Sequence, residues 1–288
     1  MSQPEAGAAA GDRGTLIVLG GHEDRAGDRL IPRAVAARAE RAALVVVTAA
    51  SNLPGEPWGD YEPVFRDLGV DDVRHLHVDT RQDAHDPERL RLLDGAAAVF
   101  FTRGNQLKLA GQLGDTPVDH RVRALYAAGG CVAGTSADAS VVTETMLVTG
   151  NSAASPHVED ALRMAPGFGL LPGVIVDQHF AERGRIGRLI GAVAQNPRLL
   201  GVGIDEDAAV VCDGGARSPC SARAACTSWT GATSRPATWS RTGATARARC
   251  TTCGCTSSTW ATPPAPAAGG RAGRRRPRPG RHRADGAP

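Results

Sequence analysis

The chain has 288 residues, of which 42% are hydrophobic and 22% are charged, and its formal net charge is +3. This composition is too apolar for global disorder and predicts one large globular domain or two small ones. It contains no run of about 18 apolar residues, and residues 1–13, which we expect to be disordered, lack the apolar core of a secretory signal. We therefore expect neither a membrane anchor nor classical export.

The charge is divided unevenly along the chain. Residues 213–288 hold thirteen Arg and two Asp and have no Leu, Ile, Val, Phe or Met, so this segment is basic and cannot build a core. The part before it is acidic, and Cys131 is its one cysteine before Cys212. Such sparse cysteine usage is typical of a cytoplasmic protein. We predict a single domain over residues 14–217 and an anomalous Arg/Ala/Thr/Cys-rich tail over residues 218–288.

The domain alternates apolar β-rich runs with helical segments. In chain order we expect a strand at 15–19, a helix at 28–40, a strand at 43–49, a helix at 58–68, strands at 73–78 and 97–101, helices at 105–113 and 118–128, a strand at 130–134, a helix at 139–146, a strand at 173–176, a helix at 182–195 and a strand at 207–212. This alternation predicts an α/β fold, a three-layer α/β/α sandwich with a mostly parallel sheet. Ligands of such sheets bind at the carboxyl ends of the strands.

The strand at 130–134 runs into small residues and then into a helix, with Ser136 at the turn. This pattern is typical of a nucleophile elbow, in which a tight turn lifts a Ser hydroxyl above the sheet and leaves backbone N–H groups open to an oxyanion. The alternative is that Thr135 or Ser136 only caps the helix. Asp138, two residues further on, places a carboxyl group beside this turn.

Other polar residues follow further strands. His179 comes after the strand at 173–176, where a general base would lie, although a structural histidine is the alternative. Arg185 and Arg188 fall on one face near a helix N-terminus, where cations oppose the helix dipole; this favours ligand binding over a solvated charged face. Gln106 opens a helix after an apolar strand, so it either belongs to a site or caps that helix.

The tail admits three interpretations. Its Arg residues could form a nucleic-acid-binding arm, and Cys250, Cys253 and Cys255 could bind zinc, although a second pair of ligands is missing. The third interpretation, which we favour, is a frameshift near residues 217–218 of a GC-rich gene. In the shifted frame the codons of residues 226–231 permit Leu-Tyr-Val-Val-Asp-Gly, which predicts a strand and a turn. We therefore expect no nucleic-acid partner.

Six segments in register together resemble the cyanophycinase family. They are Gly20-Gly21-His22-Glu23-Asp24, Phe101-Thr102-Arg103-Gly104-Asn105-Gln106, Gly134-Thr135-Ser136-Ala137, Met164-Ala165-Pro166-Gly167, Asp177-Gln178-His179-Phe180 with the arginines after it, and Gly203-Ile204-Asp205-Glu206-Asp207. The resemblance extends from residue 14 to about residue 217.

The resemblance implies a fold like that of class I glutamine amidotransferases and hydrolysis of cyanophycin, multi-L-arginyl-poly-L-aspartate, to β-Asp-Arg dipeptides by a serine-protease mechanism. It implies that Ser136 is the nucleophile, that His179 is the base, and that Gly104 and Ala137 supply oxyanion N–H groups. The substrate-binding residues that it implies are Gln106, Asp177, Gln178, Arg183, Arg185 and Arg188. Cyanophycin or β-aspartyl-arginine peptides would be the partners, with no metal, no cofactor and a possible homodimer.

The chain departs from the family pattern at three places. Asp138 and Arg103 replace usual glycines, and residues 150–155 lack the carboxylate that would orient the histidine. We assign that third catalytic position to Asn151, with Glu144, Glu159 or Asp160 as substitutes. These departures keep two alternatives open. One is an α-aspartyl dipeptidase of the same fold, and the other is a catalytically impaired relative that only binds aspartyl-arginine ligands.

Overall fold

The computed structural model describes residues 14–39, 42–49, 55–102, 104–149, 162–213, 220–223 and 226–230. All of them belong to the first of two compact units, Met1–Ser258. Within this described part, no helix has both the length and the apolar character needed to cross a membrane.

The elements alternate as the sequence predicts. The helices are α1 (Leu30–Ala36), α2 (Gly55–Asp67), the 3-10 helix η1 (Arg81–His85), α3 (Pro87–Arg91), α4 (Gln106–Leu113), α5 (Pro117–Ala127), α6 (Ala137–Val141) and α7 (Ile186–Gln195). The strands are β1 (Thr15–Leu19), β2 (Ala43–Ala49), β3 (Val73–Val78), β4 (Ala96–Phe101), β5 (Cys131–Thr135), β6 (Thr145–Thr149), β7 (Arg163–Pro166), β8 (Val174–Gln178), β9 (Leu200–Ile204), β10 (Ala209–Asp213), β11 (Cys220–Arg223) and β12 (Cys226–Thr230).

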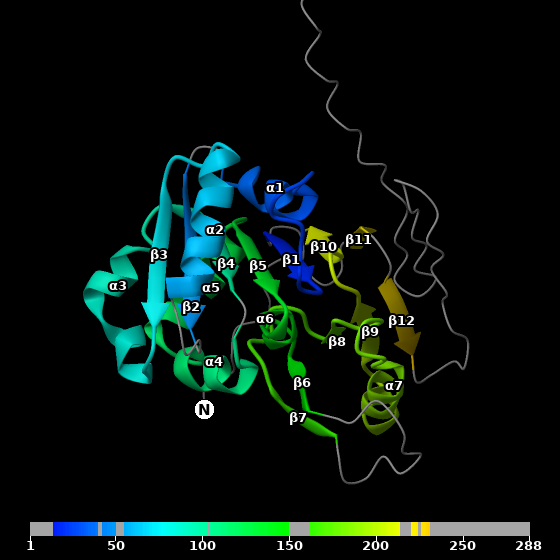
Figure 1. The fold of residues 1–288 in the computed structure, drawn as a ribbon. Coiled ribbons are helices and arrows are strands. Elements are labelled where there is room, and N and C mark those ends of the chain that lie inside the picture. The colour runs from blue at the N-terminus through cyan, green and yellow to red at the C-terminus, as the bar shows by residue number, and fades with distance from the viewer. Residues whose placement is uncertain are drawn as a thin grey trace, which may run out of the picture. The chain divides into compact units, whose positions relative to one another are not determined.

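Seven of the described strands form the main sheet in the order β11-β10-β1-β5-β4-β2-β3 (Figure 1). The pairs from β1 to β3 across this order are parallel, whereas β10 is antiparallel to β1 and to β11. Leu19 pairs with Thr135 and Phe101 pairs with Gly134, so β1, β5 and β4 end at nearly the same level. The mostly parallel sheet confirms the predicted α/β class.

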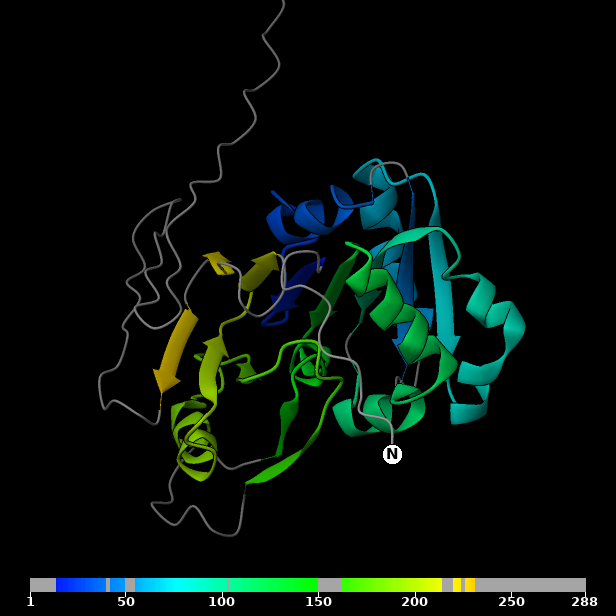
Figure 2. The ribbon, with the colours of Figure 1, turned by 180° about the vertical axis from the view of Figure 1, so that it is seen from behind.

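Each face of the main sheet packs against its own helices, which gives the three predicted layers. On one face Ile17 of β1 packs with Val35 of α1 and Phe65 of α2. On the other, Val18 of the same strand packs with side chains of α4 and α5, including Val122. Figure 1 shows α2 in front of the sheet, and the reverse view in Figure 2 brings α5 to the front. Alternate residues of β1 thus serve two cores, as expected for a strand buried on both sides.

Two smaller sheets extend the fold beside the main one. Strand β8 pairs in parallel with β9, with Gln178 opposite Ile204, and β12 pairs antiparallel with β9. Strands β6 and β7 form an antiparallel pair. The parallel pairing of β8 and β9 brings the segments after residues 178 and 204 to the same edge, which decides the composition of the site described below.

The predicted helix at 139–146 is wrong in its second half. Helix α6 ends at Val141, and residues 145–149 form strand β6. Val141, Val142 and Thr143 are β-branched and restricted in a helix. Their carbonyl groups accept hydrogen bonds from the backbone N–H groups of residues 168–171 instead of continuing the helix. Strands β6, β7 and β9 were not predicted, and the strand expected at 207–212 is β10, which is antiparallel to β1.

Strands β11 and β12 lie beyond the domain boundary predicted at residue 217. Strand β11 pairs with β10 and strand β12 pairs with β9. The sheets therefore include residues of the segment whose composition predicted no core. Strand β12 is formed by Cys-Thr-Ser-Trp-Thr, so it does not test the strand that the frameshift hypothesis predicts for the shifted sequence. The origin of the tail, and the disorder expected in residues 1–13, stay predictions, because most of these residues lie outside the described part.

Candidate active site

The end of strand β1 aligns two of the predicted catalytic residues. The backbone N–H of Ser136, at the end of β5, donates to the Leu19 carbonyl at 3.2 Å. The backbone N–H of His179, at the end of β8, donates to the next carbonyl, that of Gly20, at 3.0 Å. Ser136 and His179 are 43 residues apart in sequence, yet consecutive carbonyls of one strand fix both backbones. The structure therefore brings the two predicted residues together at the carboxyl end of β1, although β8, which precedes His179, belongs to a separate sheet.

The turn at Ser136 has the geometry of a nucleophile elbow. Ser136 has a φ of 58° and a ψ of −123°, a conformation that side-chain-bearing residues rarely adopt. A Cβ at Gly134 would lie 2.7 Å from the Asp138 carbonyl oxygen, so the turn needs a glycine there. Ser136 makes no side-chain capping bond to α6, and Thr135 donates its hydroxyl to Glu23 at 2.7 Å. The capping alternative is therefore wrong for both residues.

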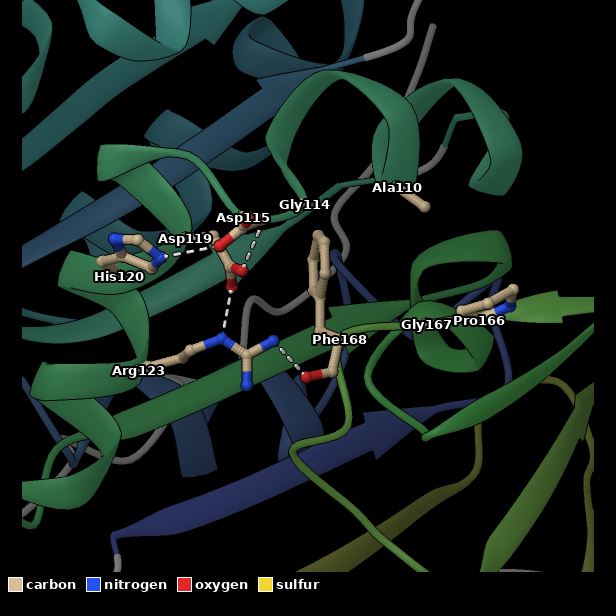
Figure 3. Close-up of a pocket in the computed structure, with 9 residues that line it drawn as sticks. All are labelled: Ala110, Gly114, Asp115, Asp119, His120, Arg123, Pro166, Gly167 and Phe168. Carbon is tan, nitrogen blue, oxygen red and sulfur yellow. Dashed lines mark hydrogen bonds and ion pairs between the residues drawn. The ribbon is translucent and has the colours of Figure 1, made fainter. Parts of the chain in front are cut away.

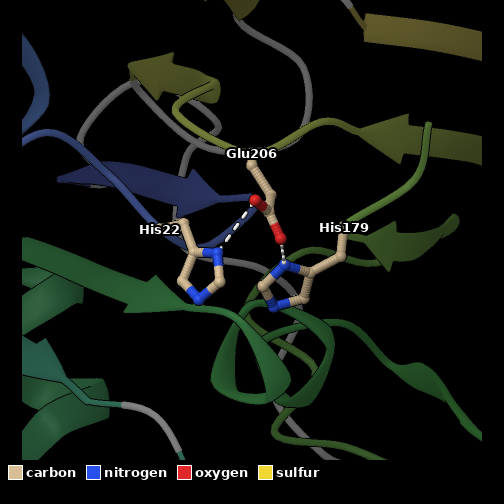
Figure 4. A group of neighbouring side chains, drawn as sticks. All are labelled: His22, His179 and Glu206. Atoms are coloured by element: carbon tan, nitrogen blue, oxygen red, sulfur yellow. Dashed lines mark hydrogen bonds and ion pairs between the residues drawn. The ribbon is translucent and has the colours of Figure 1, made fainter. Parts of the chain in front are cut away.

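A chain of short hydrogen bonds runs through His179. Its Nε2 lies 2.8 Å from the Ser136 hydroxyl, and its Nδ1 lies 2.6 Å from Oε1 of Glu206 (Figure 4). With the imidazole proton on Nδ1, Nε2 accepts from Ser136 and Nδ1 donates to the carboxylate. Burial lowers the pKa of His179 below its usual value, and the charges of Arg183 and Arg185 add to this, while Glu206 opposes it. A neutral imidazole aimed at a serine hydroxyl is the arrangement of a general base.

Glu206 lies beside Nδ1 of His179, where a residue that orients the imidazole is expected, whereas the assignment of that role to Asn151 stays a prediction. Asn151, Glu159 and Asp160 lie outside the described residues, and Glu144 is exposed. Glu206 lies in one of the segments that carry the family resemblance, but the sequence alone does not indicate a role for it. The signal that identifies it is structural: Gln178 and Ile204 are paired in parallel, so the residues after β8 and after β9 meet. Sequence spacing alone could not show that pairing.

The predicted substrate-binding residues at the end of β8 and after it divide into buried and exposed members. Asp177 is fully buried and accepts from Nε of Arg188 at 2.9 Å and from Arg185 at 3.3 Å. Arg188 is itself buried, so the alternative of a solvated charged face is wrong for it. Burial, reinforced by the charge of Arg188, lowers the pKa of Arg185 to about 10. Arg185 also donates to Gln178, and Arg183 is exposed beside them.

The predicted oxyanion groups lie around the elbow. Ala137 opens α6, and the first N–H groups of a helix have no partner within it. Gly104 follows β4, whose Phe101 pairs with Gly134, so it comes from the strand end next to the elbow. Gln106 does not cap α4: Asn105 does, and the Gln106 amide donates to the Leu147 carbonyl. Arg103 lies outside the described residues.

Asp138 is buried within the first turn of α6. Its side chain is 1% exposed, and its Oδ1 has no hydrogen-bond partner among the described residues. Burial raises the pKa of this carboxyl group well above its ordinary value. Burial thereby disfavours the negative charge that the sequence places beside the elbow.

We expect Asp138→Ala to stabilise the fold, and more so at pH 7 than at pH 4. Because the pKa of Asp138 is higher in the folded than in the unfolded protein, the wild type is most stable below the unfolded pKa near 3.8. It loses stability as the pH rises toward the folded pKa, and the alanine variant does not. Removing an unsatisfied buried polar group contributes about 1–3 kcal/mol, or roughly 2–4 °C in Tm for each kcal/mol. Thermal unfolding of both proteins at the two pH values measures this difference.

Asp119→Ala is the matched control, because Asp119 is also buried but is paired with Arg123 at 3.0 Å. Breaking that pair should destabilise the fold at pH 7. An Asp138→Ala variant less stable than the wild type, or a gain equal at both pH values, would contradict the assignment of an unpaired neutral acid.

A cavity of about 390 Å³ lies apart from these residues (Figure 3). It is lined by Ala110, Gly114, Asp115, Asp119, His120, Arg123, Pro166, Gly167 and Phe168. Its polar groups bond to one another: Arg123 pairs with Asp119 and donates to the Phe168 carbonyl, and His120 lies 3.1 Å from Asp115. No predicted site residue lines this cavity, so it is not the candidate active site.

The sequence is similar to those of known peptidases. The family model described as peptidase family S51 matches residues 25–218. The cyanophycinase of Trichormus variabilis is 40% identical over 199 residues, which cover 68% of this chain and 66% of the relative. The cyanophycinase of Synechococcus elongatus is 38% identical over 201 residues, or 69% of this chain and 62% of the relative. The matches thus span just under two thirds of the length of these curated relatives.

The fold is also found among solved structures. A peptidase from an acI-B1 Actinobacterium superposes with a TM-score of 0.61 at 24% sequence identity, and the match covers 80% of this chain and 96% of that one. At this identity the likeness concerns the fold alone, and it agrees with the α/β architecture described above.

Proposed function

Because the chain belongs to peptidase family S51, we propose that it is a serine-type exopeptidase that hydrolyses cyanophycin to β-Asp-Arg dipeptides. The observation that carries the proposal is the chain of hydrogen bonds from Ser136 through His179 to Glu206. The proposed substrate is supported by the similarity of the chain to relatives that are named cyanophycinases. The α-aspartyl dipeptidase alternative is not favoured over it.

We propose that Ser136 Oγ attacks the scissile carbonyl carbon while Nε2 of His179 takes the hydroxyl proton. Glu206 holds the Nδ1–H of His179, which keeps Nε2 free to accept and stabilises the imidazolium that forms. The N–H groups of Ala137 and Gly104 stabilise the oxyanion. His179 then gives the proton to the leaving amine as the peptide bond breaks. Water attacks the acyl carbon and loses a proton to Nε2 of His179, and Ser136 Oγ takes that proton back as its bond to the acyl group breaks.

The arginines after β8 fit the chemistry of the proposed substrate. A β-Asp-Arg unit carries carboxylates, which guanidinium groups bind with charge-assisted hydrogen bonds. We propose that Arg183 and Arg185 contact these carboxylates and that Gln106 and Gln178 contribute amide groups. Asp177 and Arg188 are buried and paired with each other, which supports a positioning role: they hold Arg185 in place.

The proposal is tested by incubating the protein with cyanophycin and, separately, with α-aspartyl dipeptides, and identifying the products by mass spectrometry. We expect β-Asp-Arg to accumulate from the polymer and the α-linked peptides to remain intact. Cleavage of the α-linked peptides alone would favour the dipeptidase. Binding of the polymer without any product would favour the impaired relative.

Two further features belong to this proposal. The family resemblance implies a homodimer, and we propose that Ile186 and Ile190, which are exposed one turn apart on α7, contribute to its interface. A cytoplasmic location is supported by Cys131, which is a free and buried cysteine. Both stay predictions.

A further inference from the structure

Three potential metal ligands meet at the proposed catalytic centre. Nδ1 of His22 lies 2.8 Å from Oε2 of Glu206, and Nδ1 of His179 lies 2.6 Å from Oε1 of the same carboxylate (Figure 4). One ligand atom from each residue lies within 4.8 Å of the others. Neither the mechanism nor the substrate contacts proposed above use His22, so its place beside Glu206 is unexplained by them.

We propose that His22, His179 and Glu206 form a binding site for a divalent transition-metal ion such as Zn²⁺, and that its occupation inhibits the peptidase. Two imidazole nitrogens and one carboxylate form a donor set that Zn²⁺ takes with a fourth position open. Mg²⁺ and Ca²⁺ prefer oxygen ligands, of which this site offers one carboxylate. The inhibitory part of the inference rests on the proposed function, whereas the binding part does not.

The three residues are held in place by the loops that carry them. His22 follows β1, His179 follows β8 and Glu206 follows β9. His179 donates its N–H to the Gly20 carbonyl, and Asp207, next to Glu206, donates to the Gly21 carbonyl at 2.9 Å. A Cβ at Gly21 would lie 2.4 Å from Cε1 of His179, so the close approach of the first and second loops depends on that glycine.

The local conformation directs both imidazoles toward the carboxylate. His22 has a φ of 49° and His179 a φ of 46°, both in the left-handed region that side-chain-bearing residues rarely occupy. Their rings meet edge to face, with centroids 5.3 Å apart. The ligands of a tetrahedral zinc ion with bonds of 2.0–2.1 Å are about 3.3 Å apart, so the present contacts need to open by several tenths of an ångström. Because the His22 side chain is 68% exposed, it has room for this shift.

Solvent access and nearby charge favour entry of a cation from the His22 side. The side chain of Glu206 is 26% exposed, while that of His179 is 4% exposed. Asp205 and Asp207 flank Glu206 in sequence, and the Glu182 carboxylate accepts from the Glu206 N–H at 3.2 Å. Arg183 and Arg185 act against the cation from the His179 side. Carboxylates and arginines thus both lie near the site, and its more exposed ligands are His22 and Glu206.

Occupation of the site would block proton transfer from Ser136. A metal ion bound at Nδ1 of His179 displaces the proton from that nitrogen. The neutral imidazole then carries its proton on Nε2, which donates to the Ser136 hydroxyl instead of accepting from it. The Glu206 carboxylate, which then binds the metal ion, no longer accepts a hydrogen bond from Nδ1 of His179. Removal of the metal by a chelator would restore the original tautomer, so the inhibition is reversible.

The test is a titration of the full-length protein with Co²⁺, followed by its visible absorption, and with Zn²⁺, followed by calorimetry. We compare the wild type, His22→Ala and His120→Ala. His120 is the matched control, because it is 62% exposed and also contacts a carboxylate, that of Asp115, away from the catalytic centre. The tail is identical in all three proteins, so any binding by its cysteines cancels and the difference between variants reports the site.

We expect His22→Ala to weaken metal binding at this site by about 10–100-fold or more, because loss of a residue that only supports a metal ligand already costs that much. His120→Ala should bind metal like the wild type. Hydrolysis by the wild type and by His120→Ala should fall with Zn²⁺ and recover with chelator. For His22→Ala, inhibition is expressed relative to its own metal-free rate and should need a correspondingly higher Zn²⁺ concentration.

Metal titrations that are the same for the wild type and His22→Ala would overturn the proposal, whether or not the protein hydrolyses cyanophycin. Metal binding that depends on His22 in a protein that hydrolyses nothing would support the site and reject the proposed function instead. Hydrolysis unaffected by a bound, His22-dependent metal would overturn the inhibitory part.

Discussion

Replacing Ser136 with alanine should lower the kcat for cyanophycin on the order of 10⁶-fold, the loss that follows removal of the nucleophile in another serine peptidase. Without the hydroxyl group no acyl-enzyme can form, and His179 has no proton to accept. The oxyanion N–H groups and the arginines after β8 are unaffected, so binding of the polymer should persist. Steady-state release of β-Asp-Arg, followed by mass spectrometry, and binding of labelled polymer measure the two effects separately.

Ser140→Ala is the matched control for this variant. Ser140 lies in the same short helix, α6, and its hydroxyl donates to the Val176 carbonyl at 3.1 Å. Its loss should reduce the free energy of unfolding by about 1 kcal/mol and leave kcat near that of the wild type. If Ser136→Ala retains wild-type turnover, or if Ser140→Ala loses as much, Ser136 is not the nucleophile.

Replacing Glu206 with glutamine should lower kcat by about 10⁴-fold, as the corresponding Asp-to-Asn change does in another serine protease. A glutamine amide can donate to Nδ1 of His179, which favours the tautomer with the proton on Nε2. Glu206 also raises the pKa of His179, so its removal should lower that pKa. Protonation of His179 then sets in at lower pH. The acid limb of the residual kcat/KM profile should move to lower pH, an effect that mere loosening of the loop would not give.

Two variants serve as controls for this second prediction. Asn151→Ala removes the residue to which sequence alone assigned the same role. Asp207→Asn neutralises the neighbouring carboxylate, whose Oδ1 accepts from the Asp24 N–H at 2.9 Å. We expect both to keep kcat within a few-fold of the wild type. A large loss in Asn151→Ala beside an active Glu206→Gln would return the third catalytic position to Asn151.

The positions of Ser136 and His179 could be predicted because both follow strands with a clear apolar pattern. Ligand-binding residues of α/β folds follow the carboxyl ends of strands. The strands before Ser136 and His179 belong to different sheets, and the bonds to the Leu19 and Gly20 carbonyls bring their ends together. Glu206 could not be found in this way, because β9 was missed. Its sequence, Leu-Gly-Val-Gly-Ile, contains two glycines, which weaken a strand pattern. Those glycines have a packing reason: a Cβ at Gly203 would lie 2.5 Å from the ring of Phe180.

Arg188 shows why burial is harder to predict than position. Its spacing from Arg185 indicated a ligand-binding face, but the helix that carries them turns Arg188 inward, where it pairs with the fully buried Asp177. A long charged side chain gives no sign in the sequence of the partner that neutralises it. The break of the helix after Val141 was missed for a related reason, since the groups that bond its last carbonyls come from residues 168–171.

The two bonds from Ser136 and His179 to the Leu19 and Gly20 carbonyls have a consequence for evolutionary change. Because the main chain carries the alignment, the identity of the side chain at position 19 can drift among apolar residues without moving either group. The glycines are different. A Cβ at Gly20 would lie 1.9 Å from the Asp205 carbonyl oxygen, and one at Gly21 would meet the imidazole of His179. Position 19 can therefore vary among apolar residues during evolution, whereas positions 20 and 21 must stay glycine.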